Sequence, residues 1–236
     1  MSRLSLLSIV VLSIVACVAS VSQATLIASD TFSYADGSLE GANGGTGWTG
    51  SWNTGTIAGG QMIGPNSAAI TRNFPGMNSG TMWVSFVANV PTGGKAVVGL
   101  DDTYWAGISF GSQWNIYYIQ NGGSVGGGVS GAANTPTLVV GKIDFNTIGV
   151  RETGYMWAYP NSDGVPASAP ANETAVSTFT TANDYETLFF FRIDLSQGAT
   201  IDNLRLGTTF EDVVVPEPAT MVLIGMGAVA LLRRRR

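Results

Sequence analysis

The chain is a succession of short runs rich in β-branched and aromatic residues, separated by Gly, Asn, Asp, Pro and Ser, with no long segment of helical period. Ten strands at intervals of roughly 8–15 residues are typical of a β-sandwich or barrel. We therefore predict a single all-β domain over residues 25–212. The expected strands cover residues 25–29, 67–74, 80–90, 95–100, 104–111, 113–120, 135–145, 153–160, 185–195 and 199–207.

Three segments between these runs are expected to be loops. Residues 37–60 ("GSLEGANGGTGWTGSWNTGTIAGG") are rich in glycine, but two embedded tryptophans indicate an ordered region and not a flexible linker. Residues 121–131 predict a mobile loop or hairpin connection, and residues 159–174 a proline-rich loop. Loops on a rigid sandwich are where binding is expected.

The N-terminal 24 residues have the layout of a secretory signal. A basic start with Arg3 precedes an apolar run over residues 4–18 and a small-x-small site at residues 22–24, which predicts cleavage after Ala24 by way of the Sec export machinery. A buried first helix is the alternative, but nothing caps it. A lipoprotein signal is another, because Cys17 follows "SIVA".

Composition restricts the chemistry of the exported body. The chain has no histidine, which excludes Ser-His-Asp and Cys-His mechanisms and imidazole ligands. Its one cysteine lies in the signal, so the body must be held together by a packed core and not by disulfides. Residues 25–212 carry 6 of the 11 basic and 15 of the 16 acidic residues, a net charge of about −9, which argues against nucleic acid as a partner.

The C-terminal segment, residues 213–236, combines a Pro-Glu-Pro motif, an apolar stretch over residues 220–232 and four final arginines. A helix over that stretch would cover about 20 Å, short of the roughly 30 Å hydrocarbon core of a bilayer. A permanent membrane anchor would therefore fit the bilayer poorly. A helix buried in the core would have to keep its four charged arginines in contact with water. A transient stop in the membrane fits better, with the basic end on the cytoplasmic side. The stopping arginines are Arg233, Arg234, Arg235 and Arg236.

This arrangement resembles a PEP-CTERM sorting signal, in which the motif Val215, Pro216, Glu217 and Pro218 precedes an apolar segment and a basic end. The resemblance covers about the last 22 residues. It implies recognition by an exosortase, a membrane-embedded processing enzyme, in a bacterium that makes exopolysaccharide. The mature protein is then expected at the cell surface or in the extracellular matrix.

A second resemblance covers most of residues 29–212. "DTFSYADGSLEG", "GGTGWTGSW", "LVVGKIDF", "MWAYP" and "IDNLRLGTTFEDV" are similar to segments of exported proteins with a concanavalin A-like jelly roll. The resemblance implies a two-sheet fold of the laminin-G or legume-lectin kind. It implies no ligand, because this fold hosts lectins, hydrolases and inert modules.

Hydrolases with this fold usually carry Glu-x-Asp-x-(x)-Glu on one strand, and this chain has no such string. The nearest acidic pairs are Asp184 with Glu186, on one face of a strand, and Glu211 with Asp212 at the end of the domain. Strand-entry charge pairs are far commoner than catalytic pairs. We predict no catalytic residues.

Other acidic residues bear on metal binding. The adjacent pairs Asp101–Asp102 and Asn183–Asp184 could supply oxygen ligands to calcium, but adjacent acids in a turn are usually solvated. No cofactor is expected. Asp144 and Asp202 are expected to satisfy backbone or turn donors and not to bind a ligand.

Six tryptophans raise the question of carbohydrate binding. Trp48 and Trp52 would share one face of an extended segment, and sugar rings stack on such platforms. The alternative is that both fill the core, which we expect for Trp83 and Trp157. A second aromatic cluster on neighbouring strands either lines or fills a sheet face; its members are Trp105, Trp114, Tyr117 and Tyr118.

These features together predict an exported, acidic, non-catalytic jelly roll that acts as a structural or adhesive module of a polysaccharide matrix. A carbohydrate-binding lectin is the alternative, and a glycan hydrolase is the less favoured third reading.

Overall fold

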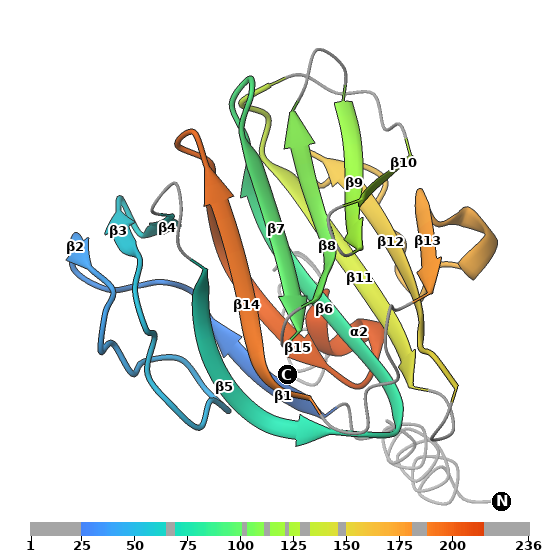
Figure 1. Ribbon diagram of the computed structural model, residues 1–236, viewed down its shortest axis with the longest axis horizontal. Coiled ribbons are helices and arrows are strands. Elements are labelled where there is room, and N and C mark those ends of the chain that lie inside the picture. The colour runs from blue at the N-terminus through green and yellow to red at the C-terminus, as the bar shows by residue number, and fades with distance from the viewer. Residues whose placement is uncertain are drawn as a thin grey trace, which may run out of the picture.

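The computed structural model describes residues 25–64, 69–100, 103–110, 114–120, 123–127, 133–145, 150–180 and 188–214. In this part of the chain two antiparallel sheets lie face to face, the six-stranded sheet in front of the nine-stranded one in Figure 1. The predicted all-β, two-sheet sandwich is confirmed.

Each sheet is an ordered row of paired strands. The six-stranded sheet has the order β10 (Gly123–Gly127), β9 (Trp114–Gln120), β8 (Thr103–Phe110), β7 (Lys95–Leu100), β14 (Leu188–Ser196) and β5 (Ile70–Met77). The nine-stranded sheet has the order β13 (Ser177–Thr180), β12 (Thr153–Pro160), β11 (Thr137–Phe145), β6 (Gly80–Asn89), β15 (Thr200–Gly207), β4 (Gln61–Ile63), β3 (Thr56–Ala58) and β2 (Gly37–Ser38), and β1 (Leu26–Asp30) also pairs with β15.

The order of the strands is that of a jelly roll. The chain changes sheet at β5, β6 and β7 and runs as a meander through β7–β10 in the six-stranded sheet. It changes sheet at β11, forms a second meander through β11–β13 in the nine-stranded sheet, and changes sheet again at β14 and β15. The two last strands thereby enter places beside early ones, β14 between β5 and β7 and β15 beside β6. This wrapping brings the first strand of the domain against its last strand.

All ten predicted strands are present among the described residues. The sequence did not predict β2, β3 and β4, which are two or three residues long, or β13. Residues 123–127 were expected to be loop or hairpin connection, but Gly123–Gly127 pairs along β9 as a strand. The proline-rich loop is confirmed, with one 3-10 turn, η1 (Asn172–Thr174), inside it.

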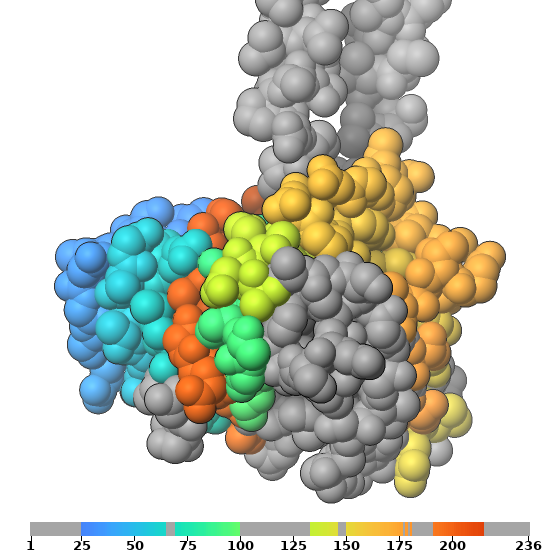
Figure 2. Space-filling view, turned by 90° about the horizontal axis from the view of Figure 1, so that it is seen from above, coloured from blue at the N-terminus to red at the C-terminus, as the bar shows by residue number. Residues whose placement is uncertain are grey.

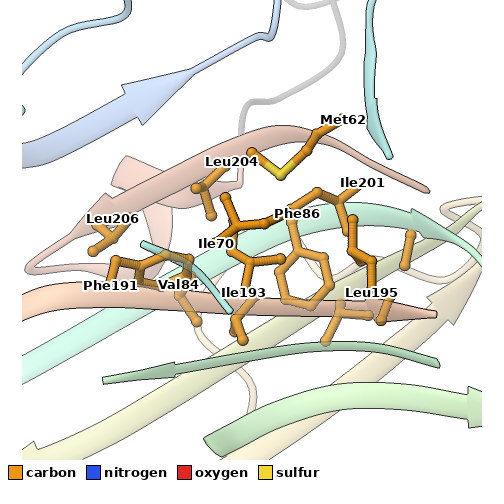
Figure 3. Packing of buried hydrophobic residues seen from close by; sticks show 14 of the residues in the cluster. Met62, Ile70, Val84, Phe86, Phe191, Ile193, Leu195, Ile201, Leu204 and Leu206 are labelled. Carbon is orange, nitrogen blue, oxygen red and sulfur yellow. The ribbon is translucent and has the colours of Figure 1, made fainter. Parts of the chain in front are cut away.

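Alternating residues of facing strands form the main core. Met82, Val84 and Phe86 of β6 point inward from the nine-stranded sheet, and Phe191 and Ile193 of β14 meet them from the six-stranded sheet. Figure 3 shows this interdigitation between the two layers. A core of this size stabilises the domain by hydrophobic burial, as a body without cysteine requires.

A second apolar cluster lies on the outer face of the nine-stranded sheet. Its buried members are Trp83, Val140, Trp157, Phe210 and Val213, and we call it the outer cluster. Trp83 alternates along β6 with the inward residues, so both faces of this strand are covered, as its sequence indicates. The short helix α2 (Phe210–Val213) and the segment over residues 161–176 supply the cover.

Among the described residues, no helix is long and apolar enough to cross a membrane. The predicted signal, residues 1–24 with Ala24 and Cys17, lies outside the described residues. The same holds for the sorting segment from residue 215 onward.

Candidate functional site

The aromatic residues considered for sugar binding converge on a buried ion pair at one edge of the sandwich. Asp30 ends β1, which pairs with the nine-stranded sheet, and Arg72 lies in β5 of the six-stranded sheet. Arg72 Nη1 lies 2.8 Å from Asp30 Oδ2, and the two side chains are 1% and 2% exposed. The pair therefore links the two sheets across the interior. We call Asp30, Arg72, Tyr34, Trp48 and Trp52 the Asp30 centre.

The Asp30 carboxylate is saturated with donors. Its Oδ2 accepts from the Tyr34 hydroxyl at 2.6 Å and from Trp52 Nε1 at 3.0 Å, and its Oδ1 accepts from the Phe32 backbone N–H at 2.9 Å. Such charge-assisted bonds offset the cost of removing a carboxylate from water. Through these hydrogen bonds Asp30 holds the loop after β1 in place.

Arg72 is held equally firmly. Its Nε donates to the Gly50 carbonyl at 2.7 Å and its Nη2 to Asn43 Oδ1 at 3.2 Å. The guanidinium carbon lies 5.1 Å from the ring centre of Trp48 and 5.3 Å from that of Trp52, within cation–π range. The planar guanidinium therefore ties the glycine-rich loop to β5 through polar and aromatic contacts at once.

The surroundings of Tyr34 in the Asp30 centre shift the pKa of its phenol. Burial raises the pKa of the Tyr34 phenol above its usual value, and the hydrogen bond to Asp30 and the negative charge of that carboxylate raise it further. Arg72 acts in the opposite direction. Tyr34 therefore remains a neutral donor to Asp30 throughout the physiological pH range.

Glycine is required where the loop passes closely over β1. A Cβ on Gly47, whose φ is +80°, would lie 1.9 Å from the Ile27 carbonyl oxygen, and a Cβ on Gly45 would lie 2.4 Å from the Ser29 carbonyl oxygen. The loop also bonds to the other sheet, because the Thr49 N–H donates to the Asn73 carbonyl at 3.1 Å. Because it bonds to both sheets, the loop covers the gap between them at this edge of the sandwich.

The two tryptophans of this loop differ in what they offer a ligand. Trp52 is 1% exposed, its Nε1 is used by Asp30, and it packs against Phe32, so it presents no face to a sugar. Trp48 is half-buried, with its Nε1 donating to the Ser29 carbonyl at 3.0 Å. Of the predicted pair of stacking residues, the structure thus leaves a partly exposed surface only at Trp48.

Trp83 and Trp157 are core residues, as predicted, at 5% and 3% exposure. Their rings stack in the outer cluster with centres 5.6 Å apart, and Trp157 Nε1 donates to Thr174 Oγ1 at 3.1 Å. Directly across the strands from Trp83 lie Lys142 and then Tyr155. The Lys142 ammonium lies 5.1 Å from the Tyr155 ring centre, a contact that no sequence pattern indicated.

Three of the described acidic residues that the sequence singled out, Asp144, Asp202 and Asp212, have structural partners. Asp202 Oδ1 accepts from the Asn203 backbone N–H at 2.7 Å within β15, as expected for an acid that satisfies a backbone donor. Asp144 instead pairs with side chains: its Oδ2 lies 2.8 Å from Lys142 Nζ, and its Oδ1 accepts from Thr81 Oγ1 at 2.7 Å. The expectation of a backbone role for Asp144 was wrong, because the sheet places Lys142 two residues away on the same face.

Asp212, with Glu211 the acidic pair at the end of the domain, is a helix cap. Its Oδ2 accepts from the backbone N–H groups of Thr208 and Thr209 at 2.9 and 2.8 Å, and the Thr209 hydroxyl accepts from the Asp212 N–H at 3.3 Å. This reciprocal arrangement is a capping box at the start of α2. The Asp212 carboxylate is therefore occupied with local backbone.

Several predicted residues fall outside the description. Asp101, Asp102, Asn183, Asp184 and Glu186 lie outside the described residues. The backbones of Trp105, Trp114, Tyr117 and Tyr118 lie in the neighbouring strands β8 and β9, and their side chains are outside the described part. Within the described ranges, no group of three or more Asp, Glu, Cys or His side chains could hold a metal ion.

Comparison with solved structures finds distant likenesses. A laminarinase from Rhodothermus marinus is 14% identical, with a TM-score of 0.37 over 80% of this chain and 99% of that one. A β-1,3-glucanase from Mycobacterium marinum is 10% identical, with a TM-score of 0.35 over 75% and 97%. A protein of unknown function from Shewanella oneidensis MR-1 is 11% identical, with a TM-score of 0.36 over 92% and 98%. Likeness at this level carries no information about activity.

The C-terminal segment gives the specific match. The sequence matches no curated protein. Residues 214–236 match the family model of the PEP-CTERM protein-sorting motif, over the residues that the sequence had indicated. The motif implies processing by an exosortase. The chain therefore carries a PEP-CTERM protein-sorting motif, which marks it for export to the cell surface or extracellular space through transient membrane anchoring.

Proposed function

We propose that the exported body is a non-catalytic structural or adhesive module of a polysaccharide matrix. The observation that supports this best is the use made of the Asp30 centre. Its acid, its arginine and one of its two tryptophans are buried and bonded to one another, and they join the two sheets and the loop between them. Groups that could act on a ligand instead hold the sandwich closed.

The other described acids support the same proposal. Asp144 is paired with Lys142 and Asp212 caps a helix, so each carboxylate has a structural partner. A glycosidase needs two carboxyl groups facing a shared cleft, one of them free to move a proton. Of the described acids, Asp144 and Asp212 are engaged in these structural contacts.

Fractionation of the producing cells tests the proposal. A structural or adhesive module should be recovered with the exopolysaccharide after washing, and deleting its gene should weaken the cohesion of the matrix. The purified protein should release no reducing ends from that polysaccharide over many hours. Recovery of the protein in the culture medium alone, with an unchanged matrix, would count against this role.

A lectin is the second candidate, and the observation that favours it is Trp48. Its indole is partly exposed and fixed by the Ser29 carbonyl, by Arg72 and by Trp52, whose ring centre is 5.5 Å away. A rigid aromatic surface binds a sugar at small entropic cost. A glycan array with the wild-type protein and Trp48→Ala separates the two candidates. Val150→Ser, at a site 54% exposed, is the control.

A lectin would lose binding in Trp48→Ala and keep it in Val150→Ser. A purely structural module would bind no single oligosaccharide in any form, and its tryptophan emission would not move on addition of sugar.

A further inference from the structure

The residues directly before the sorting motif are fixed to the outer face of the nine-stranded sheet. The Ser85 hydroxyl of β6 donates to the Val213 carbonyl at 2.6 Å, and Arg205 Nε of β15 donates to the Asp212 carbonyl at 2.9 Å. The Phe210 ring meets Trp83 edge-on with centres 5.4 Å apart. Helix α2 is thus pinned to two adjacent strands by polar and apolar contacts.

The backbone of β15 is shaped for this contact. A Cβ on Gly207 would lie 2.2 Å from the Asp212 Cβ, so only glycine allows the turn before α2 to fold back so closely. The capping box then fixes the first turn of the helix. The end of the domain is therefore a built attachment, which we call the α2 clasp: Gly207, Thr209, Phe210, Asp212 and Val213.

The clasp continues up to the sorting segment without a spacer. Val214 donates its N–H to the Phe210 carbonyl at 2.9 Å and packs against the outer cluster. From Val214 to the apolar stretch at residue 220 there are six residues, which span at most about 20 Å when fully extended. The tail thus leaves from the middle of this face on a short tether.

The other end of the body lies at the same place. The Thr208 N–H donates to the Thr25 carbonyl at 3.2 Å, and Leu26 pairs with Gly207. The residue that follows the predicted signal therefore meets the start of α2. Both apolar segments of the precursor join the body on one side.

We propose that the α2 clasp determines which side of the body faces the membrane while the tail is anchored. The outer face of the nine-stranded sheet, covered by α2 and residues 161–176, is held toward the bilayer, and the six-stranded sheet is presented to the exterior. Figure 2 shows residues 150–180, in gold, as a lobe away from the blue and cyan N-terminal loop.

The charges on this side indicate that the tether, and not lipid affinity, holds the face in place. Glu173 in η1 and Glu211 in α2 are exposed acids on this side. The basic residues Lys142 and Arg205 of the same face are engaged by Asp144 and by the Asp212 carbonyl. Acidic side chains are not attracted to anionic bilayers, whose surface recruits basic residues. The body should therefore separate from the membrane once the tail is cut.

Single-cysteine labelling of the anchored precursor tests the proposal. The full-length gene with Cys17→Ser is expressed in a host that has a signal peptidase but no exosortase, and the protein is reconstituted into vesicles and recovered by flotation. A fluorescent donor is placed at Glu173→Cys on the membrane-facing side or at Asn73→Cys, exposed on β5 of the other sheet. Since stacked sheets lie about 10 Å apart, energy transfer to an acceptor lipid should be about twofold or more greater from residue 173.

A spacer variant completes the design. Ten Gly/Ser residues inserted between Val214 and Val215 leave the clasp intact but free the body, so the two probes should then give equal transfer. Equal transfer without the insertion would overturn the proposal. A difference that survives the insertion would also overturn it, because the face would then bind lipid by itself. Circular dichroism of each variant confirms that the body is folded.

Discussion

Arg72 Nη1 lies 2.8 Å from Asp30 Oδ2, and this contact joins strands of opposite sheets. Replacing Asp30 with Asn would leave the guanidinium buried without a counter-charge. Breaking a buried pair on one side costs about 3–5 kcal/mol. We therefore expect Asp30→Asn to lower the free energy of unfolding by that amount in urea titration.

The double variant Asp30→Asn with Arg72→Met is the control for this prediction. Removing both charges should cost clearly less than the sum of the two single changes, since neither charge is then left alone. Strict additivity would mean that the ion pair does not couple the sheets.

Gly207→Ala tests the clasp. Its Cβ would lie 2.2 Å from the Asp212 Cβ, so α2 must shift away from the sheet. Overpacking of this kind costs about 1–3 kcal/mol. Gly50→Ala is the matched control, because its Cβ would meet nothing closer than 3.7 Å. Thermal melts should show a lower midpoint for Gly207→Ala alone; equal midpoints would contradict the close approach.

The two loop tryptophans should differ in their contribution to stability. Trp52→Phe removes a donor from the buried Asp30 carboxylate, and such a loss costs about 1–3 kcal/mol. Trp48→Phe removes the hydrogen bond from the half-buried indole to the Ser29 carbonyl. This change should lower the free energy of unfolding by about 1 kcal/mol or less. Urea titration of both variants measures the difference, and a larger loss in Trp48→Phe would contradict the assignment.

Asp202 gives a prediction about pH. Burial raises the pKa of this carboxyl; the Asn203 backbone N–H opposes the shift and the charge of Asp30 adds to it. The folded state then holds the proton more tightly than the unfolded chain, so the contribution of Asp202 to stability improves as the pH falls through its folded pKa.

Asp202→Asn should accordingly raise the free energy of unfolding at pH 7, by no more than about 0.5 kcal/mol because the carboxylate is half-exposed and screened. At pH 3, where both states are protonated, the gain should vanish. Urea titrations at the two pH values measure this, and an equal gain at both would show that the effect is not electrostatic.

The strands were predictable because their signal is local. Alternation in residues such as 139–145 and the turn residues around them reflect the period of a half-buried strand. β10 was missed because "GSVGG" has almost no side chains with a preference for strand, and pairing with β9 determines its structure. The two- and three-residue strands are likewise too short to produce a period.

The Asp30 centre could be predicted only in part. The embedded tryptophans indicated that the glycine-rich loop is ordered, which the contacts of Trp48 and Trp52 confirm. Arg72 lies 42 positions from Asp30, and nothing local shows that a charged residue within a strand turns inward. The partners of Asp144 and Asp212 depend in the same way on strand register and on the fold-back at Gly207.

The bond between Thr208 and Thr25 has a consequence for how such a protein is assembled from parts. Because the first and last strands of the body pair side by side, the domain is a cassette with both joints at one point. Such a cassette can be exchanged between a leader and a sorting tail without a change in the distance between them. Different exported domains could thus carry the same signal peptide and the same sorting segment, provided that the N- and C-termini of each domain also lie side by side.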